Sequence, residues 1–237
     1  ASSSYEGFQT PPVPVIQNCI IIAPTYGINV SNYRSVLLKS NTFANCGISV
    51  SNVASAYIQD NDISLGARQN YSGIVFNNSG GYIRNNTIKN RANGIHLANS
   101  SPDIGGNLIE NNYLHGLYIA GSSFPNLIGQ LQTNPPAYYP LAGYNRIRNN
   151  GYNTQPNSSN DGSEIYFSYS DAYLGTLKRP GCNEISDDRT ATSTMETIWL
   201  LSGNYGNEPH FLDAIYNYWG TTTPNTNRFG IAANFTP

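Results

Sequence analysis

The sequence predicts an all-β fold, a right-handed parallel β-helix (β-solenoid) with three short strands per coil and about eight coils. Three observations predict it: a short Asn motif that recurs along almost the whole chain, a Gly motif that recurs between its copies, and apolar runs too short for helices. The right hand follows from the crossover preference of parallel β connections.

The first motif is Asn-x-apolar, as in Asn86-Thr-Ile88. A recurrent Asn at a bend can bond the backbone of its own turn and the equivalent Asn amide one rung above, so stacked copies form a ladder. We therefore expect an Asn ladder at one turn. Its predicted members are Asn18, Asn41, Asn61, Asn86, Asn107, Asn145, Asn183 and Asn217.

The second motif is a glycine followed by alternating apolar residues, as in Gly94-Ile-His-Leu, and the third is a short strand such as Ala56-Tyr-Ile-Gln that runs into the next Asn motif. The copies are spaced by roughly 20 to 26 residues in the first half of the chain, the period range of solenoids. The apolar runs alternate with period two and are broken by Gly or Asn, which favours strands over a helical repeat.

The motifs divide the chain into three parts. Residues 1–14, rich in proline, form a predicted entry arm; residues 15–224 form the β-helix; residues 225–237 form a C-terminal tail or cap. Long polar segments interrupt the motifs within residues 129–196. Because the Asn motif resumes after each of them, they are predicted to be loops on the scaffold, where binding sites often lie.

Composition indicates an extracellular or cell-surface protein. Charged residues make up 11% of the chain, its formal net charge is −2, and Asn, Ser, Thr, Gly and Tyr are abundant. A net charge of this sign and size does not indicate a basic surface that would bind nucleic acid. The sequence contains no apolar run of about 18 residues, so it predicts no membrane-spanning helix. Cys19, Cys46 and Cys182 lie in different coils and indicate neither a disulfide framework nor a metal site.

Two segments carry a resemblance to a known family. Gly94-Ile-His-Leu-Ala-Asn99 and Ile83-Arg-Asn-Asn-Thr-Ile88 resemble the right-handed parallel β-helix repeats of the pectate-lyase-like superfamily. The end, Asn217-Tyr-Trp-Gly, is similar to the terminal coil of β-helix domains in large secreted or surface-anchored bacterial proteins. The resemblance implies the fold over about residues 15–224, but it selects no activity, because the superfamily includes lyases, hydrolases, epimerases, tailspikes and adhesins.

The residue between the two apolar residues of the Gly motif is expected to point outward. Coil by coil, this predicted outward row is Asn29, Ser49, Val75, His96, Tyr118, Tyr166 and Trp199. The last four would form a stripe of rings suited to glycans or to a neighbouring subunit. The alternative is that these rings only pack on one another.

Catalytic candidates are few. Asp161, Glu164 and Asp171 lie on or beside the predicted Tyr166 coil, and a polysaccharide lyase or glycoside hydrolase using these acids is one alternative. A cluster of loop acids is, however, more typical of a solvated or calcium-holding turn. The chain lacks the polygalacturonase-type signature as a set, so we expect no catalysis and no cofactor, with calcium left open.

These observations favour a rigid structural or adhesin-like surface module. Its Tyr/Trp-lined face is expected to contact a polysaccharide, another glycan, neighbouring protein subunits or the rest of a larger chain. Besides the enzyme, a second alternative is a subunit of an extracellular filament or layer, because an uncharged Asn/Ser/Thr/Tyr surface packs with little desolvation cost.

Overall fold

The computed structural model describes residues 13–67, 69–128, 142–151, 162–175, 181–188, 199–204, 212, 214, 217–221 and 229. Residues 1–12 of the predicted entry arm, most of the predicted loops within 129–196 and, apart from residue 229, the predicted tail lie outside this set.

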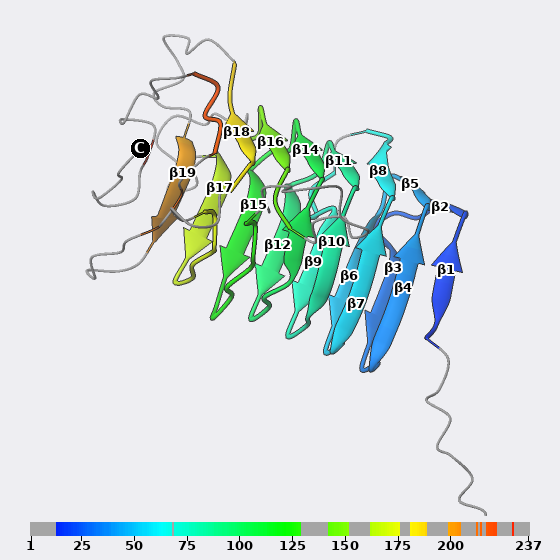
Figure 1. Cartoon of the computed structure of the whole chain (residues 1–237). Coiled ribbons are helices and arrows are strands. Elements are labelled where there is room, and N and C mark those ends of the chain that lie inside the picture. The colour runs from blue at the N-terminus through cyan, green and yellow to red at the C-terminus, as the bar shows by residue number, and fades with distance from the viewer. Residues whose placement is uncertain are drawn as a thin grey trace, which may run out of the picture.

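The chain winds into a solenoid with three parallel sheets (Figure 1). Sheet A contains β1 (Val15–Gln17), β4 (Ser35–Lys39), β7 (Ser55–Gln59), β10 (Gly81–Arg84) and β13 (Asp103–Gly105). Sheet B contains β2 (Ile20–Ile22), β5 (Thr42–Ala44), β8 (Asp62–Leu65), β11 (Thr87–Lys89), β14 (Leu108–Glu110), β16 (Arg146–Arg148) and β18 (Glu184–Ser186). Sheet C contains β3 (Tyr26–Ser31), β6 (Gly47–Ser51), β9 (Ile74–Asn77), β12 (Asn93–Ala98), β15 (His115–Ala120), β17 (Ser163–Ser168) and β19 (Trp199–Asn204).

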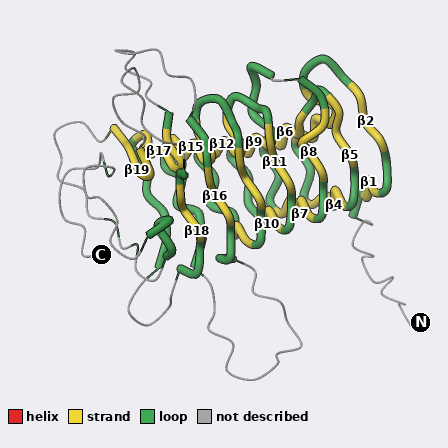
Figure 2. Tube along the Cα trace, turned by 90° about the horizontal axis from the view of Figure 1, so that it is seen from above, coloured by secondary structure: helices red, strands yellow, loops and turns green. Residues whose placement is uncertain are grey.

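The number of coils is lower than the predicted eight in the part of the chain that the structure describes. Sheet A has five strands and sheets B and C have seven each, so five coils are complete and two more have strands in sheets B and C only (Figure 2). Isolated bridges, such as that of Asn126 to Tyr173, continue the line of sheet A. The difference from the predicted number arises after β15, where the described residues in line with sheet A form such bridges and not strands.

The core is a set of aliphatic columns that run along the solenoid. Parallel, in-register pairing places equivalent residues of successive coils one above the other, so the same face of each strand is buried. In sheet B, Ile88, Ile109, Ile147 and Ile185 follow one another in register, and all four are fully buried. Each fully buried aliphatic side chain stabilises the fold by about 1.5–3 kcal/mol.

An asparagine ladder runs along the corner before sheet B. In each rung from Asn41 to Asn183 the side-chain amide donates to the Oδ1 atom of the next asparagine, over 2.8–3.1 Å, and to a backbone carbonyl of a neighbouring coil. Its members are Asn41, Asn61, Asn86, Asn107, Asn145, Asn183 and Asn217.

Asn18 was predicted to be the first rung, and the structure places it elsewhere. Asn18 is exposed and has a φ of 57°, and it is the backbone N–H of Cys19 that donates to Asn41 Oδ1. Each ladder residue from Asn41 to Asn183 is preceded by a residue in the left-handed region, such as Asp60 or Asn85. Asn18 takes this preceding position because Asn tolerates positive φ better than most residues.

The described residues contain no helix with the length and apolar character needed to cross a membrane.

Candidate functional site on the outer face of sheet C

The outer face of sheet C is built from two rows of outward residues in register. The first row is Asn29, Ser49, Val75, His96, Tyr118, Tyr166 and Ser202. The second row is Ser31, Ser51, Asn77, Ala98, Ala120, Ser168 and Asn204. Alternation directs the side chains of the first six strands away from the core, and Ser202 and Asn204 of β19 are given by backbone register alone.

Three rings occupy the first row at its centre. Tyr118 and Tyr166 are parallel to within 3°, with ring centroids 5.4 Å apart, and His96 meets Tyr118 edge-on at 4.8 Å. Two parallel rings at this distance overlap with an offset, the arrangement that aromatic pairs prefer. All three side chains are partly exposed, so the face presents phenol and imidazole edges to solvent.

His115 joins this cluster although the sequence reasoning did not place it there. Its ring stacks on Tyr166 at 4.7 Å and on Tyr118 at 5.6 Å, and it is almost fully buried. Strict alternation would group His115 with the inward Leu117. A Cβ atom at Gly116, however, would lie 2.6 Å from Ile147 Cγ2, so position 116 also faces the interior and the alternation breaks there. The glycine repeated at the start of the first five strands of sheet C, at positions 27, 47, 73, 94 and 116, is the signal that could have revealed this break.

Burial favours the neutral forms of His96, His115 and Tyr166. Burial, with a smaller effect of His96, lowers the pKa of His115 to about 3, and burial lowers the pKa of His96. The backbone N–H of Ser163 donates to His115 Nδ1 over 3.2 Å, so the neutral ring carries its proton on Nε2. Burial, followed by Tyr118 and Tyr169, raises the pKa of Tyr166.

Trp199 does not continue the row. It was predicted to follow Tyr166, but it pairs with Ser163, and Ser202 is the partner of Tyr166. The reason is that two successive leucines, Leu200 and Leu201, are both buried, which shifts the outward position three residues beyond Trp199. The Trp199 side chain lies outside the described part of the structure.

A family model independently recognises the coils that carry most of this face. Residues 6–150, more than half of the chain, match the family described as "Right handed beta helix region". The chain belongs to the right-handed β-helix family. No curated protein and no solved structure matches it significantly.

Of the three candidate acids in this right-handed β-helix, the structure describes two, Glu164 and Asp171. Glu164 is fully buried, and its carboxylate accepts the backbone N–H of Asn150 over 2.9 Å and its side-chain amide over 2.5 Å. Asp171 lies after β17, and its Oδ1 atom accepts the N–H of Ala172. Asp161 lies outside the described residues. Glu164 therefore lies on the Tyr166 coil as predicted, but its side chain is buried, since position 164 corresponds to the inward Gly116 of the preceding coil.

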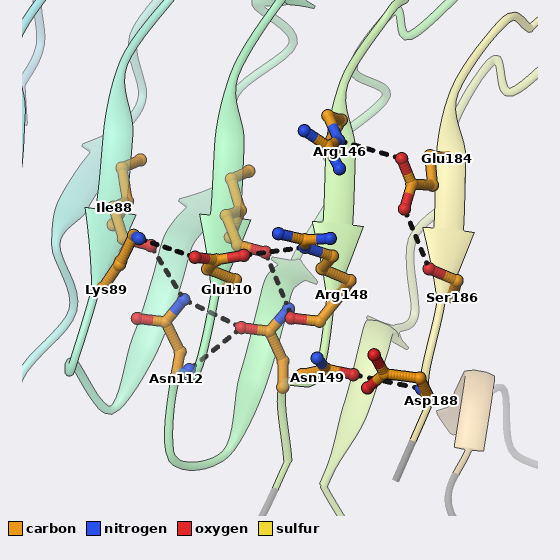
Figure 3. A network of polar contacts seen from close by, with 12 residues as sticks. Ile88, Lys89, Glu110, Asn112, Arg146, Arg148, Asn149, Glu184, Ser186 and Asp188 are labelled. Atoms are coloured by element: carbon orange, nitrogen blue, oxygen red, sulfur yellow. Dashed lines mark hydrogen bonds and ion pairs between the residues drawn. The ribbon is translucent and has the colours of Figure 1, made fainter. Parts of the chain in front are cut away.

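Ion pairs of this β-helix lie on the outer face of sheet B instead (Figure 3). Glu110 forms ion pairs with Lys89, over 2.6 Å, and with Arg148, over 2.7 Å. Arg146 forms an ion pair with Glu184 over 2.9 Å. Burial alone would raise the pKa of Glu110, but the hydrogen bonds from Lys89 and Arg148 outweigh it and lower the pKa. This surface is a fixed ion-pair network.

The described residues contain no group of three or more His, Cys, Asp or Glu side chains that could hold a metal ion. The three cysteines are free thiols, of which Cys46 is buried and Cys19 is exposed.

Proposed function

We propose that this β-helix is a non-catalytic, rigid surface module that binds a glycan on the outer face of sheet C. The observation that carries the proposal is the ring cluster of Tyr118, Tyr166 and His96, half-exposed and held in place by the buried His115 ring. Aromatic side chains combine an apolar surface with a polar group, the combination that sugars require.

The scaffold supports binding without rearrangement. Every strand under the cluster is hydrogen-bonded to both neighbours in sheet C, and the side chains below are fully buried, as for Leu117 and Ile165. A ligand that meets a preformed surface loses less free energy to ordering of the protein.

Catalysis is not part of the proposal. The carboxylate of Glu164 lies in the interior and accepts hydrogen bonds from Asn150. The described positions of the two outward rows contain no Asp or Glu that could act beside the rings.

We place the module outside the cell or on its surface, as a rigid adhesin-like domain that is free-standing or part of a larger chain. Its low content of charged residues, 11%, and a surface rich in hydroxyl and amide groups support this location.

Native affinity electrophoresis of the purified protein through gels containing polysaccharides tests the proposal. We expect retardation in at least one gel, and Tyr118→Ala and Tyr166→Ala should each abolish most of it. Tyr82→Ala is the matched control, because the rings of Tyr57 and Tyr82 lie 4.7 Å apart, tilted by 33°, on the outer face of sheet A. Retardation that persists in the Tyr166→Ala protein and is lost in the Tyr82→Ala protein would place the site on sheet A instead.

A second candidate function, assembly into a filament or layer, is favoured by the first coil. Among the described strands, β1, β2 and β3 lie at the edges of their sheets, and Ile20 and Ile22 of β2 are 78% and 74% exposed. Unpaired edges with apolar side chains favour the addition of further strands. Sedimentation velocity should then show concentration-dependent association that Ile20→Lys abolishes and the control Thr42→Lys leaves unchanged.

A further inference from the structure

We infer that the ligand of this face is an uncharged polysaccharide lying along the solenoid axis, and that acidic polysaccharides are not its ligands. The inference rests on the proposed function and names the chemical class of the ligand.

The first argument is the absence of charge. The two outward rows span seven strands, and none of their described positions holds Asp, Glu, Lys or Arg. A carboxylate or sulfate laid on this face would lose part of its hydration and gain no cation in return, which costs free energy.

Among the described strands, the outward charged side chains lie on the other two sheets. Sheet B carries the network of Lys89, Glu110 and Arg148, and the outer face of sheet A carries Lys39 and Arg84. Low overall charge therefore does not account for the neutrality of sheet C, since charged residues are present at equivalent outward positions of both other sheets.

The two imidazoles of the cluster add no positive charge to the outer face of sheet C near neutral pH. His115 lies against Tyr118 and Tyr166, and His96 against Tyr118, and burial lowers the pKa of both histidines. Neither ring supplies a cation for an acidic sugar.

The second argument is the repetition of hydrogen-bonding groups along the axis. Hydroxyls and amides recur in the outward rows, and an exposed rim of asparagines follows the strands of sheet C. These rim residues, all with positive φ, are Asn32, Asn52, Asn78 and Asn99. Neighbouring rungs are about 4.8 Å apart, so equivalent groups repeat at a short, regular interval. A repeating chain of sugar hydroxyls matches this better than a single sugar does.

A protein partner is less favoured by the same surface. Val75 is the one branched aliphatic side chain in the described positions of the two rows, and the alanines Ala98 and Ala120 are small. A stable protein interface normally has an apolar core, and this face offers rings only at its centre.

The test is the same electrophoresis with four gels: hydroxyethylcellulose and glucomannan as neutral polymers, polygalacturonate and alginate as acidic ones. We expect retardation by a neutral polymer with a Kd that changes less than about twofold between low and high salt, because no ion pairs contribute. Tyr166→Ala should weaken it about tenfold or more, and Tyr82→Ala by less than about twofold.

The outcomes separate the two proposals. Retardation by an acidic polymer alone, lost in the Tyr166→Ala protein and at high salt, would overturn the ligand class and leave the binding site in place. No retardation in any gel would overturn glycan binding itself. Association of the protein with itself through this face, blocked by Tyr166→Ala, would identify a neighbouring subunit as the partner and overturn both.

Discussion

The Glu164 carboxylate accepts both the backbone N–H and the side-chain amide of Asn150, at 2.9 Å and 2.5 Å. Asn150 is the end of a second, shorter ladder, in which Asn112 donates to Asn150 Oδ1 and the N–H of Arg91 donates to Asn112 Oδ1. Glu164 thus supplies the acceptor for the last rung of this ladder. It does so from the position that glycine occupies in the preceding coil.

Replacing Glu164 tests this relationship. Glu164→Gly restores the residue of the preceding coil but removes two hydrogen bonds of Asn150, so we expect the free energy of unfolding to fall by about 2–4 kcal/mol. Glu164→Gln keeps one oxygen acceptor and should cost about half as much. Urea denaturation measures both. If Glu164→Gly were as stable as the parent protein, the carboxylate would have no role in the ladder.

The main asparagine ladder gives a second prediction. Asn86 Oδ1 accepts the backbone N–H and the side-chain amide of Asn61. The N–H and side-chain amide of Asn86 donate to Asn107 Oδ1, and the amide also donates to the carbonyl of Ile58. Asn86→Ala should lower the free energy of unfolding by about 3 kcal/mol, because buried backbone groups lose their partners. The control is the neighbouring Asn85→Gly, at an exposed left-handed position, for which a change below about 1 kcal/mol is expected. Equal losses in thermal or urea denaturation would contradict a special role for the ladder.

Introducing a charge distinguishes the core from the outer face. Ile88 is fully buried between Ile63 and Ile109, so Ile88→Asp should abolish folding, since an unpaired carboxylate would lie inside the coil stack. Ser49→Asp, on the outer face of sheet C, should fold normally. Circular dichroism and gel filtration of the two purified proteins are sufficient, and a folded Ile88→Asp protein would contradict the buried column.

His115 makes stability depend on pH. Its pKa is about 3 in the folded protein against 6.5 ordinarily, so between these values the unfolded chain binds more protons than the native one. The free energy of unfolding should therefore fall as the pH decreases from about 6.5 toward about 3, by roughly 2–3 kcal/mol between about pH 7 and about pH 4.5.

The matched variant is His115→Asn, which removes the titrating ring and keeps an acceptor for the N–H of Ser163. The pKa of Glu110 is lowered in the folded state, so its protonation in acid also lowers the free energy of unfolding. This contribution should be equal in the parent protein and in His115→Asn. Urea denaturation at the two pH values should show a smaller loss for His115→Asn. The same loss in both proteins would mean that His115 is not responsible.

Repetition explains why so much of the fold could be predicted. In a parallel solenoid each coil pairs in register with the next, so one recurring motif places Asn41, Asn61 and Asn86 on the same corner and Ile88 and Ile109 in the same column. The same logic placed Tyr118 beside Tyr166 and His96 beside Tyr118. Prediction was weaker where the motif changed, as at Asn18 and Trp199, because a shift of a few residues moves a side chain to another position of the coil.

The sequence by itself determined the class of fold, the corner occupied by the asparagines and six of the seven residues in the first outward row of sheet C, because periodic spacing is enough to place equivalent residues above one another. Only the tertiary structure decided that His115 packs against Tyr118 and Tyr166 and that Glu164 turns inward to Asn150. Both depend on how the backbone bends at the corner into sheet C, where strict alternation ends and the direction of a side chain is set by the coils packed on either side.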